Sequence, residues 1–221
     1  MARIIPLLLV LFAALGARAL PTLTGPTGLV VLPDALAADA GLRLAGDVAE
    51  TPGDRGILLR GVVGLSAGEV GLLYASDDEA LLGANGKLVF PVAFLDAEGA
   101  VGAIYLDAEL VTQRCLYLAV TRRGPLSLTG GLTWTEVRTV AGSADAVRPY
   151  AGAVLTLPGG LRVMGEVQAK CARLEPKAIT SLRIARAEGL LTTVVGVTNA
   201  VALLGTTEHY LFAGMSLAFS A

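Results

Sequence analysis

Residues 126–135 read LSLTGGLTWT and alternate between two kinds of side chain. One set consists of leucines, a tryptophan and one glycine, and the other of serine, threonine and glycine. A period of two residues places the two sets on opposite faces of a β-strand. The stretch therefore predicts a strand with one apolar face and one face of small residues.

The same alternation recurs in runs of about 7–11 residues, which is the length that a tilted membrane strand needs. Glycine, proline, asparagine and aspartate separate the runs. These alternating runs predict twelve strands: Leu42–Ala49, Gly56–Ser66, Glu69–Ala75, Lys87–Leu95, Gly99–Leu106, Arg114–Arg122, Leu126–Thr135, Arg148–Thr156, Leu161–Ala169, Ala178–Arg186, Leu190–Thr198 and Glu208–Phe219. An even count is usual for bacterial outer-membrane barrels, and soft boundaries leave about 10–14 strands open.

Composition favours a membrane setting for these strands. Hydrophobic residues make up 54% of the chain and charged residues only 16%, where about 25% is ordinary for soluble domains. The face opposite the apolar one reads mainly as Gly, Ala, Ser and Thr with few charges, which favours a narrow, filled barrel interior. We therefore expect an all-β fold, an up-and-down antiparallel transmembrane β-barrel. A secreted or periplasmic β-sandwich binding module remains the alternative, because its strands also alternate.

One segment, Gly189–Thr207, is free of charge and long enough to be considered as a helix. Its threonines and valines favour strands, and Thr198-Asn199 reads as a turn. Without a spanning helix, a closed barrel is the other way to satisfy backbone polar groups in lipid.

The connections between the strands fall into three kinds. Glycine and proline predict tight hairpins, while two longer stretches predict rim loops and a third predicts one helical turn. The hairpins are Glu98-Gly99, Arg123–Pro125, Pro158–Gly160 and Glu188-Gly189, the rim loops are Val140–Val147 and Ala172–Lys177, and the helical turn is Glu79–Gly83.

The N-terminal part of the chain divides at Ala19. Residues 1–19 combine Arg3, an apolar stretch and a small-x-small site before Leu20, and so predict a signal peptide and export to the outer membrane. Residues 20–41 carry too much Pro and Gly for a central strand. We expect an irregular segment that lies within the barrel or closes one end, followed by the barrel over residues 42–221.

The side chains give little sign of catalysis. His209 is the only histidine, no metal-ligand spacing is present, and Gly-x-Ser-x-Gly is absent. We expect a non-enzymatic protein with no catalytic, cofactor-binding or metal residues. An outer-membrane hydrolase, the second alternative, would need a rim cluster of His, Asp or Ser. The chain also lacks a basic run of the kind that binds nucleic acid.

Glu166 is expected to point into the barrel on the same face as Arg162, with Arg183 of the next strand also inward. A buried carboxylate needs a partner, so these residues predict structural charge pairs in the lumen. Cys115 and Cys171 are expected on opposite faces, which predicts free thiols. The aromatic residues that we expect at the membrane interface are Trp134, Tyr74 and Tyr210.

Three stretches carry a family resemblance: GPTGLVVLPDA at 25–35, YLAVTR at 117–122 and VMGEV at 163–167. They resemble bacterial outer-membrane barrels related to the YjbH-like proteins, which are associated with exopolysaccharide production. Val167 stands where that family usually has an aromatic residue. The resemblance implies a barrel and an address in the cell envelope. From the barrel itself we expect a structural, docking or narrow-passage role in the envelope, with a link to exopolysaccharide as the resemblance suggests. The expected partners are membrane lipids, the barrel-assembly machinery and envelope polysaccharide.

Overall fold

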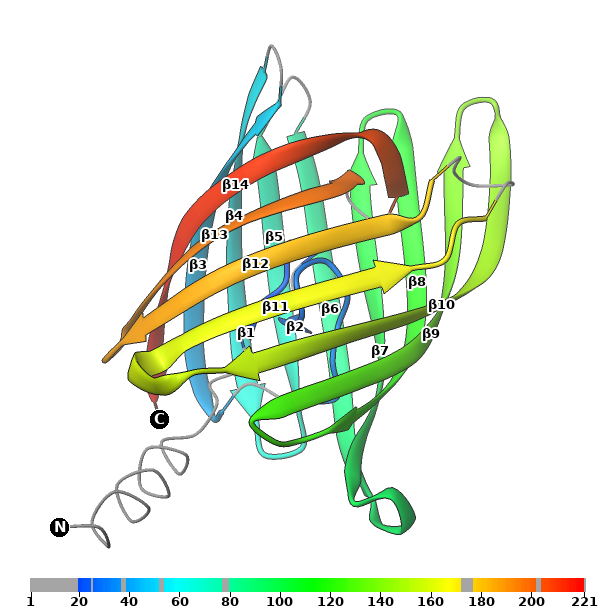
Figure 1. Cartoon of the computed structure of the whole chain (residues 1–221). Helices are drawn as coiled ribbons and strands as arrows, with labels where there is room; N and C mark the ends of the chain where they lie inside the picture. The colour runs from blue at the N-terminus through cyan, green and yellow to red at the C-terminus, as the bar shows by residue number, and fades with distance from the viewer. Residues whose placement is uncertain are drawn as a thin grey trace, which may run out of the picture.

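A computed structural model describes residues 20–24, 26–36, 39–51, 54–76, 80–171, 177–201 and 204–220. Twelve antiparallel strands, β3 to β14, form a closed barrel (Figure 1). The strands are β3 Gly41–Thr51, β4 Asp54–Leu65, β5 Gly68–Ser76, β6 Ala80–Val92, β7 Ala97–Ala108, β8 Val111–Arg122, β9 Leu126–Thr139, β10 Gly142–Thr156, β11 Leu161–Gln168, β12 Ile179–Glu188, β13 Leu191–Val201 and β14 Leu204–Ser220.

Strand order in the barrel follows strand order in the chain. Each strand pairs with its neighbours in sequence, and β14 closes the barrel against β3 from Leu211↔Glu50 to Ser220↔Gly41. Each of the twelve predicted strands overlaps one observed strand. The predicted all-β, up-and-down antiparallel barrel is therefore confirmed.

The barrel has two ends, which we name by the chain terminus. At the proximal end β3 begins and β14 finishes, and the C-terminus lies there in Figure 1. The predicted hairpins at Arg123–Pro125, Pro158–Gly160 and Glu188-Gly189 also lie at this end. Gly159 and Gly189 have φ of 76° and 60°, the left-handed region that favours glycine. The opposite end is called distal.

Several predicted connections are wrong because strand pairing extends further than the sequence pattern indicates. Residues 80–83 of the predicted helical turn begin β6, with Ser76 paired to Ala80. The predicted loop Val140–Val147 is mostly strand, since β9 and β10 are separated only by residues 140–141. Glu98-Gly99 lies inside β7, and the connection before it is a short 3₁₀ turn, η1 Ala93–Leu95. Residues 172–176 of the other predicted loop lie outside the described residues.

Thr198-Asn199 is a bulge within β13 and not a turn. The register with β14 shifts between Thr198 and Ala200. The Asn199 amide takes over the backbone pairing there, accepting from the Thr180 N–H (2.7 Å) and donating to the carbonyls of Ala178 (2.8 Å) and Thr206 (3.0 Å). The turn chemistry of asparagine is thus used inside a strand.

Large apolar side chains are exposed on the outer face of every barrel strand. On β14 these are Leu211, Met215, Leu217 and Phe219. An exposed apolar surface this extensive is unfavourable in water and matches the outward apolar band of a membrane barrel. No helix in the described part of the chain is long and apolar enough to cross a bilayer.

The interior is more highly charged than the sequence pattern predicted. Six basic and three acidic side chains of the strands are buried, with relative exposures of 7% or less. They are Arg43, Arg60, Lys87, Arg148, Arg162 and Arg183, with Asp47, Glu69 and Glu166. The expectation of an inner face with few charges is therefore wrong. Glycine, alanine and threonine are the most numerous residues on the inward face. The isolated charged residues among them are therefore easily overlooked in the sequence pattern.

Candidate functional site: the plugged lumen

The N-terminal segment lies within the barrel. Its described residues, 20–24 and 26–36, are called the plug. Two short strands, β1 Leu20–Pro21 and β2 Thr27–Gly28, pair with each other, and Figure 1 shows this pair between the barrel walls. Leu29, Val30, Val31 and Leu32 follow at 0–1% exposure. Residues 1–19 lie outside the described part of the chain, so the signal peptide stays a prediction.

A tight turn after β2 forms the centre of the plug. The Leu29 N–H donates to the Leu32 carbonyl at 3.0 Å, and Gly28 forms an isolated bridge with Pro33. A Cβ at Gly28 would lie 2.6 Å from the Leu32 carbonyl oxygen, so only glycine fits this close approach. The turn leaves the next three backbone N–H groups pointing together toward one side.

Glu166 of β11 binds those three N–H groups. The Val30, Val31 and Leu32 amides donate to its carboxylate at 3.1, 2.7 and 3.1 Å. Successive N–H groups of this kind form a concavity that suits an anion. Hydrogen bonds to an ionised acceptor are also stronger than neutral ones. Glu166 therefore fixes the turn to the wall of the barrel.

Arg183 of β12 binds backbone carbonyl groups of the same turn. Its Nη2 donates to the carbonyl of Gly28 at 3.2 Å and to that of Leu29. The guanidinium is 2% exposed and close enough to attract the Glu166 carboxylate electrostatically. One acid and one base of neighbouring strands thus hold the N–H groups and the carbonyls of a single turn.

The C-terminal part of the plug is held by three other strands. Lys87 of β6 donates to the Leu36 carbonyl at 2.5 Å, and its Nζ lies 3.7 Å from Asp34 and 3.2 Å from Glu69 of β5. The Tyr150 hydroxyl donates to the Pro33 carbonyl at 2.8 Å. The Thr121 hydroxyl of β8 accepts a hydrogen bond from the Ala35 N–H at 2.9 Å.

The N-terminal part of the plug is held by β4. Arg60 donates to the Thr22 carbonyl and forms a close ion pair with Asp47 of β3. Both side chains of this pair are buried, with 3% and 2% exposure. The plug is thus bound by charged side chains on two opposite arcs of the wall.

Apolar packing adds to these polar contacts. Val30, Val31 and Leu32 belong to one buried cluster with wall residues such as Met164 and Ile179. A Cβ at Gly152 of the wall would come within 2.2 Å of Leu29 Cδ1, so the glycine makes room for that side chain. Each fully buried residue of this size contributes about 1.5–3 kcal/mol. The closed arrangement is therefore strongly favoured over one with the plug in water.

The predicted lumen residues are placed as follows. Glu166, Arg162 and Arg183 are 7%, 6% and 2% exposed and face the lumen. The prediction named arginine partners for Glu166 and did not foresee the three backbone amides, which come from residues more than 130 positions earlier. No local pattern reports such a contact. The only local sign of this turn in the sequence was that Gly28 and Pro33 flank it.

The other singled-out residues take varied positions. Cys115 and Cys171 are free cysteines, as predicted. His209 is exposed and lies 3.4 Å from the Thr180 hydroxyl. Tyr210 is buried at 8% exposure and lines the lumen, so its prediction as an interface residue is wrong. Within the described ranges, no group of three His, Cys, Asp or Glu side chains could hold a metal.

Replacing Lys87 with methionine is expected to destabilise the protein by about 3–5 kcal/mol, because it leaves Glu69 and Asp34 buried beside an uncharged group. Urea midpoints followed by heat-modifiable gel migration would measure this. Arg123→Met is the control, since it removes a 2.7 Å pair with Glu98 at an exposed rim, where about 0–1 kcal/mol is expected. Equal midpoints for the two variants would contradict a structural role for the buried cluster.

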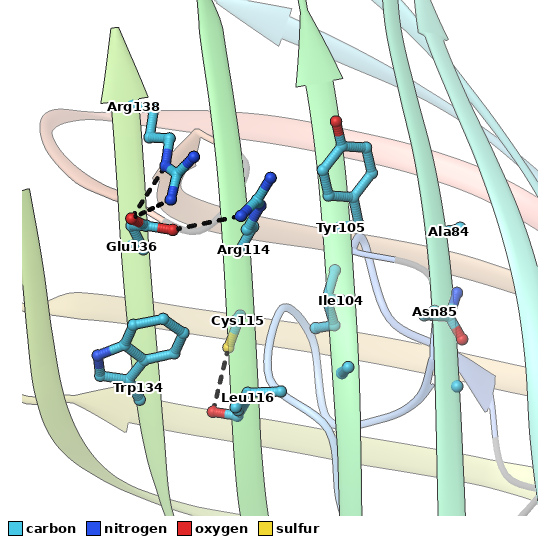
Figure 2. Close-up of a pocket in the computed structure, with 12 residues that line it drawn as sticks. Ala84, Asn85, Ile104, Tyr105, Arg114, Cys115, Leu116, Trp134, Glu136 and Arg138 are labelled. Atoms are coloured by element: carbon cyan, nitrogen blue, oxygen red, sulfur yellow. Dashed lines mark hydrogen bonds and ion pairs between the residues drawn. The ribbon is translucent and has the colours of Figure 1, made fainter. Parts of the chain in front are cut away.

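The outer wall of β6 to β9 carries a groove of about 560 Å³. Figure 2 shows Glu136 between Arg138 and Arg114, with Trp134 and Leu116 one row nearer the middle of the strands. The carboxylate lies 2.9 Å from Arg138 and 3.8 Å from Arg114. These side chains are outward, so charged residues here stand on the same face as the apolar band.

The charges on β8 mark the edges of that band. Arg114 and Arg122 are both exposed, and Leu116, Leu118 and Val120 lie between them on the outward face. Eight residue steps span roughly 26 Å along a strand, or about 20 Å along the membrane normal at a tilt of about 40°. That is close to the ~25 Å apolar band of such barrels.

Leu118→Arg is expected to cost about 2–4 kcal/mol because it places a charge at the middle of this band, whereas Thr112→Arg on the same face should cost about 0–1 kcal/mol. Folding equilibria in lipid vesicles would measure both variants. Equal costs would mean that the membrane does not sit between Arg114 and Arg122.

The closed strand order and the outward apolar band define a twelve-stranded barrel of the outer-membrane type, here with a plugged lumen. No protein-family model and no curated protein matches the chain. Solved porin structures share its fold. A KdgM porin aligns with 9% identity and a TM-score of 0.64, over 80% of this chain and 99% of that one.

Two further solved structures give similar values. A KdgM porin in complex with disordered oligogalacturonate has 9% identity and a TM-score of 0.65, with 81% of this chain and 99% of that chain covered. A NanC porin has 7% identity and a TM-score of 0.62, with 81% and 100% covered. At these identities the likeness is one of fold.

Proposed function

We propose that this protein is a non-enzymatic outer-membrane barrel that provides a narrow passage, held closed by its own N-terminal plug, for anionic solutes. The observation that carries the proposal is the charge of the wall behind the plug. Six buried bases face three buried acids there. A low-dielectric channel lined mainly by one sign of charge concentrates solutes of the opposite sign.

The solute class that we propose is acidic saccharides. Arginine predominates among the lumen bases, and its planar guanidinium binds carboxylates in a bidentate manner. A neighbouring fold, the KdgM porin, has been solved with oligogalacturonate. The resemblance to YjbH-like proteins predicts exopolysaccharide as the source of the solute. This source, export by a signal peptide and assembly by the barrel machinery all stay predictions.

Uptake of oligogalacturonate into proteoliposomes tests the proposal. The intact chain should admit little of it, whereas a chain lacking residues 20–36 should admit it faster than a neutral maltooligosaccharide of equal length. Equal uptake of the charged and neutral saccharides by the shortened chain would contradict the proposed selectivity. Strong uptake through the intact chain would contradict closure by the plug.

A further inference from the structure

The lumen on the distal side of the plug contains a cavity of about 300 Å³ whose walls are largely apolar. Leu23 of the plug lines the proximal side of this cavity. The large apolar side chains that face it from the strands are Leu58, Leu73, Leu81, Leu106, Tyr210 and Phe212. Barrel interiors are usually polar or filled, so an open apolar cavity in this position needs an explanation.

The lining is held in shape by close packing behind it. A Cβ at Gly196 would lie 2.4 Å from Phe212 Cζ, and one at Gly83 would lie 2.7 Å from Leu106 Cδ2. Phe212 and Leu106 are 2% and 1% exposed. Their side chains are therefore seated on glycines of the wall, which keeps them back from the middle of the cavity.

The charged groups nearest the cavity are engaged elsewhere. Among the described residues that line the cavity, Asp47 is the charged one, and it forms an ion pair with Arg60. The small residues Ala49, Ala75 and Ala108 line the cavity toward the distal strand ends. Apolar surface thus continues from the plug toward the distal mouth, and a polar headgroup would have to remain at that mouth.

We propose that this cavity binds a single unbranched acyl chain, which enters from the distal end and reaches the plug at Leu23. A volume of this size is at the lower limit of ligand pockets. It accommodates about ten non-hydrogen atoms, if each takes the ~30 Å³ of a water molecule in the liquid. Acyl chains are the apolar molecules that surround a membrane barrel, and leaving the cavity to water would be unfavourable. Binding does not depend on the proposed passage function.

Quenching of a tryptophan placed in the cavity tests this proposal. Trp134 is the only tryptophan, so Trp134→Phe gives a silent background. Phe212→Trp places a reporter in the cavity, and Leu211→Trp places the matched control on the outer face of the same strand. 8-Bromooctanoate should quench the Phe212→Trp reporter saturably, and octanoate should reverse the effect. The control should respond linearly, as expected for partition into detergent.

A linear response at Phe212→Trp, or none, would overturn the proposal. Tyr210→Trp, which also lines the cavity, is the second reporter in case Phe212→Trp does not fold. Adding Leu106→Gln to either reporter should raise the half-saturating concentration about tenfold, because a polar amide replaces buried apolar surface. An unchanged half-saturation would place the quencher outside the cavity and equally overturn the proposal.

Discussion

Deleting residues 20–36 while retaining residues 1–19 is expected to convert a closed barrel into an anion-selective channel. Removal of the plug takes Asp34 away and leaves six buried bases and three acids on the wall in contact with water. Planar-bilayer recordings should show stepwise conductance for the shortened chain and none for the intact one. In a salt gradient, the reversal potential should indicate an anion preference of several-fold.

A charge-neutralised variant provides the control for this selectivity. Arg43, Arg148 and Arg162 are buried on the lumen side of their strands, with exposures of 4%, 1% and 6%. Replacing all three with glutamine in the shortened chain leaves three bases against three acids. The anion preference should then disappear while conductance remains. A cation preference in the shortened chain would contradict the assignment of the lumen charges.

Glu166→Gln is expected to release the plug from the wall without unfolding the barrel. A neutral amide offers one acceptor oxygen where the carboxylate offers two, and its NH₂ group would face the donors of Val30 to Leu32. Arg183 would also lose a nearby negative charge. Leaving buried donors without an acceptor costs about 1–3 kcal/mol each, and more where a charged group is involved. Proteinase K should cut within residues 20–36 much faster than in the unaltered protein, and brief channel openings should appear.

Two further variants show whether this effect is specific to the plug. Glu188→Gln removes an exposed partner of Arg186, so it should change neither proteolysis nor conductance. Arg183→Met added to Glu166→Gln should give less than the sum of the two single effects, because the residues act on one turn. Strict additivity would mean that Glu166 and Arg183 hold the plug independently.

The strands of this protein were predictable because one face of each must contact lipid. In Leu161–Gln168, for example, the inward Arg162 and Glu166 alternate with outward Val163 and Val167, and period two is visible in a single sequence. The ends were harder. Pairing across the barrel carries β9 and β10 on to Thr139 and Gly142, through residues that read as a loop, because ladder hydrogen bonds outweigh local turn preference.

The site was predictable only in part. Parity placed Glu166 and Arg183 inward, yet their partners in the plug are separated from them by more than 130 residues. The charge of the lumen was underestimated because Arg43, Arg148 and Lys87 are single bases among small residues. The apolar cavity could not be seen at all, since Leu23, Leu73 and Phe212 come from separate segments that meet only after the barrel closes.

Cysteine accessibility of the plug turn is the most direct test of the account. With Cys115 and Cys171 changed to serine, Leu32→Cys places a thiol at a position that is 1% exposed in the lumen, and Ala141→Cys places one in an exposed turn. In lipid vesicles, a polar maleimide should label position 141 within minutes and position 32 only after unfolding. Rapid labelling of position 32 in the folded, membrane-inserted protein would mean that the lumen is not closed by its own N-terminal segment.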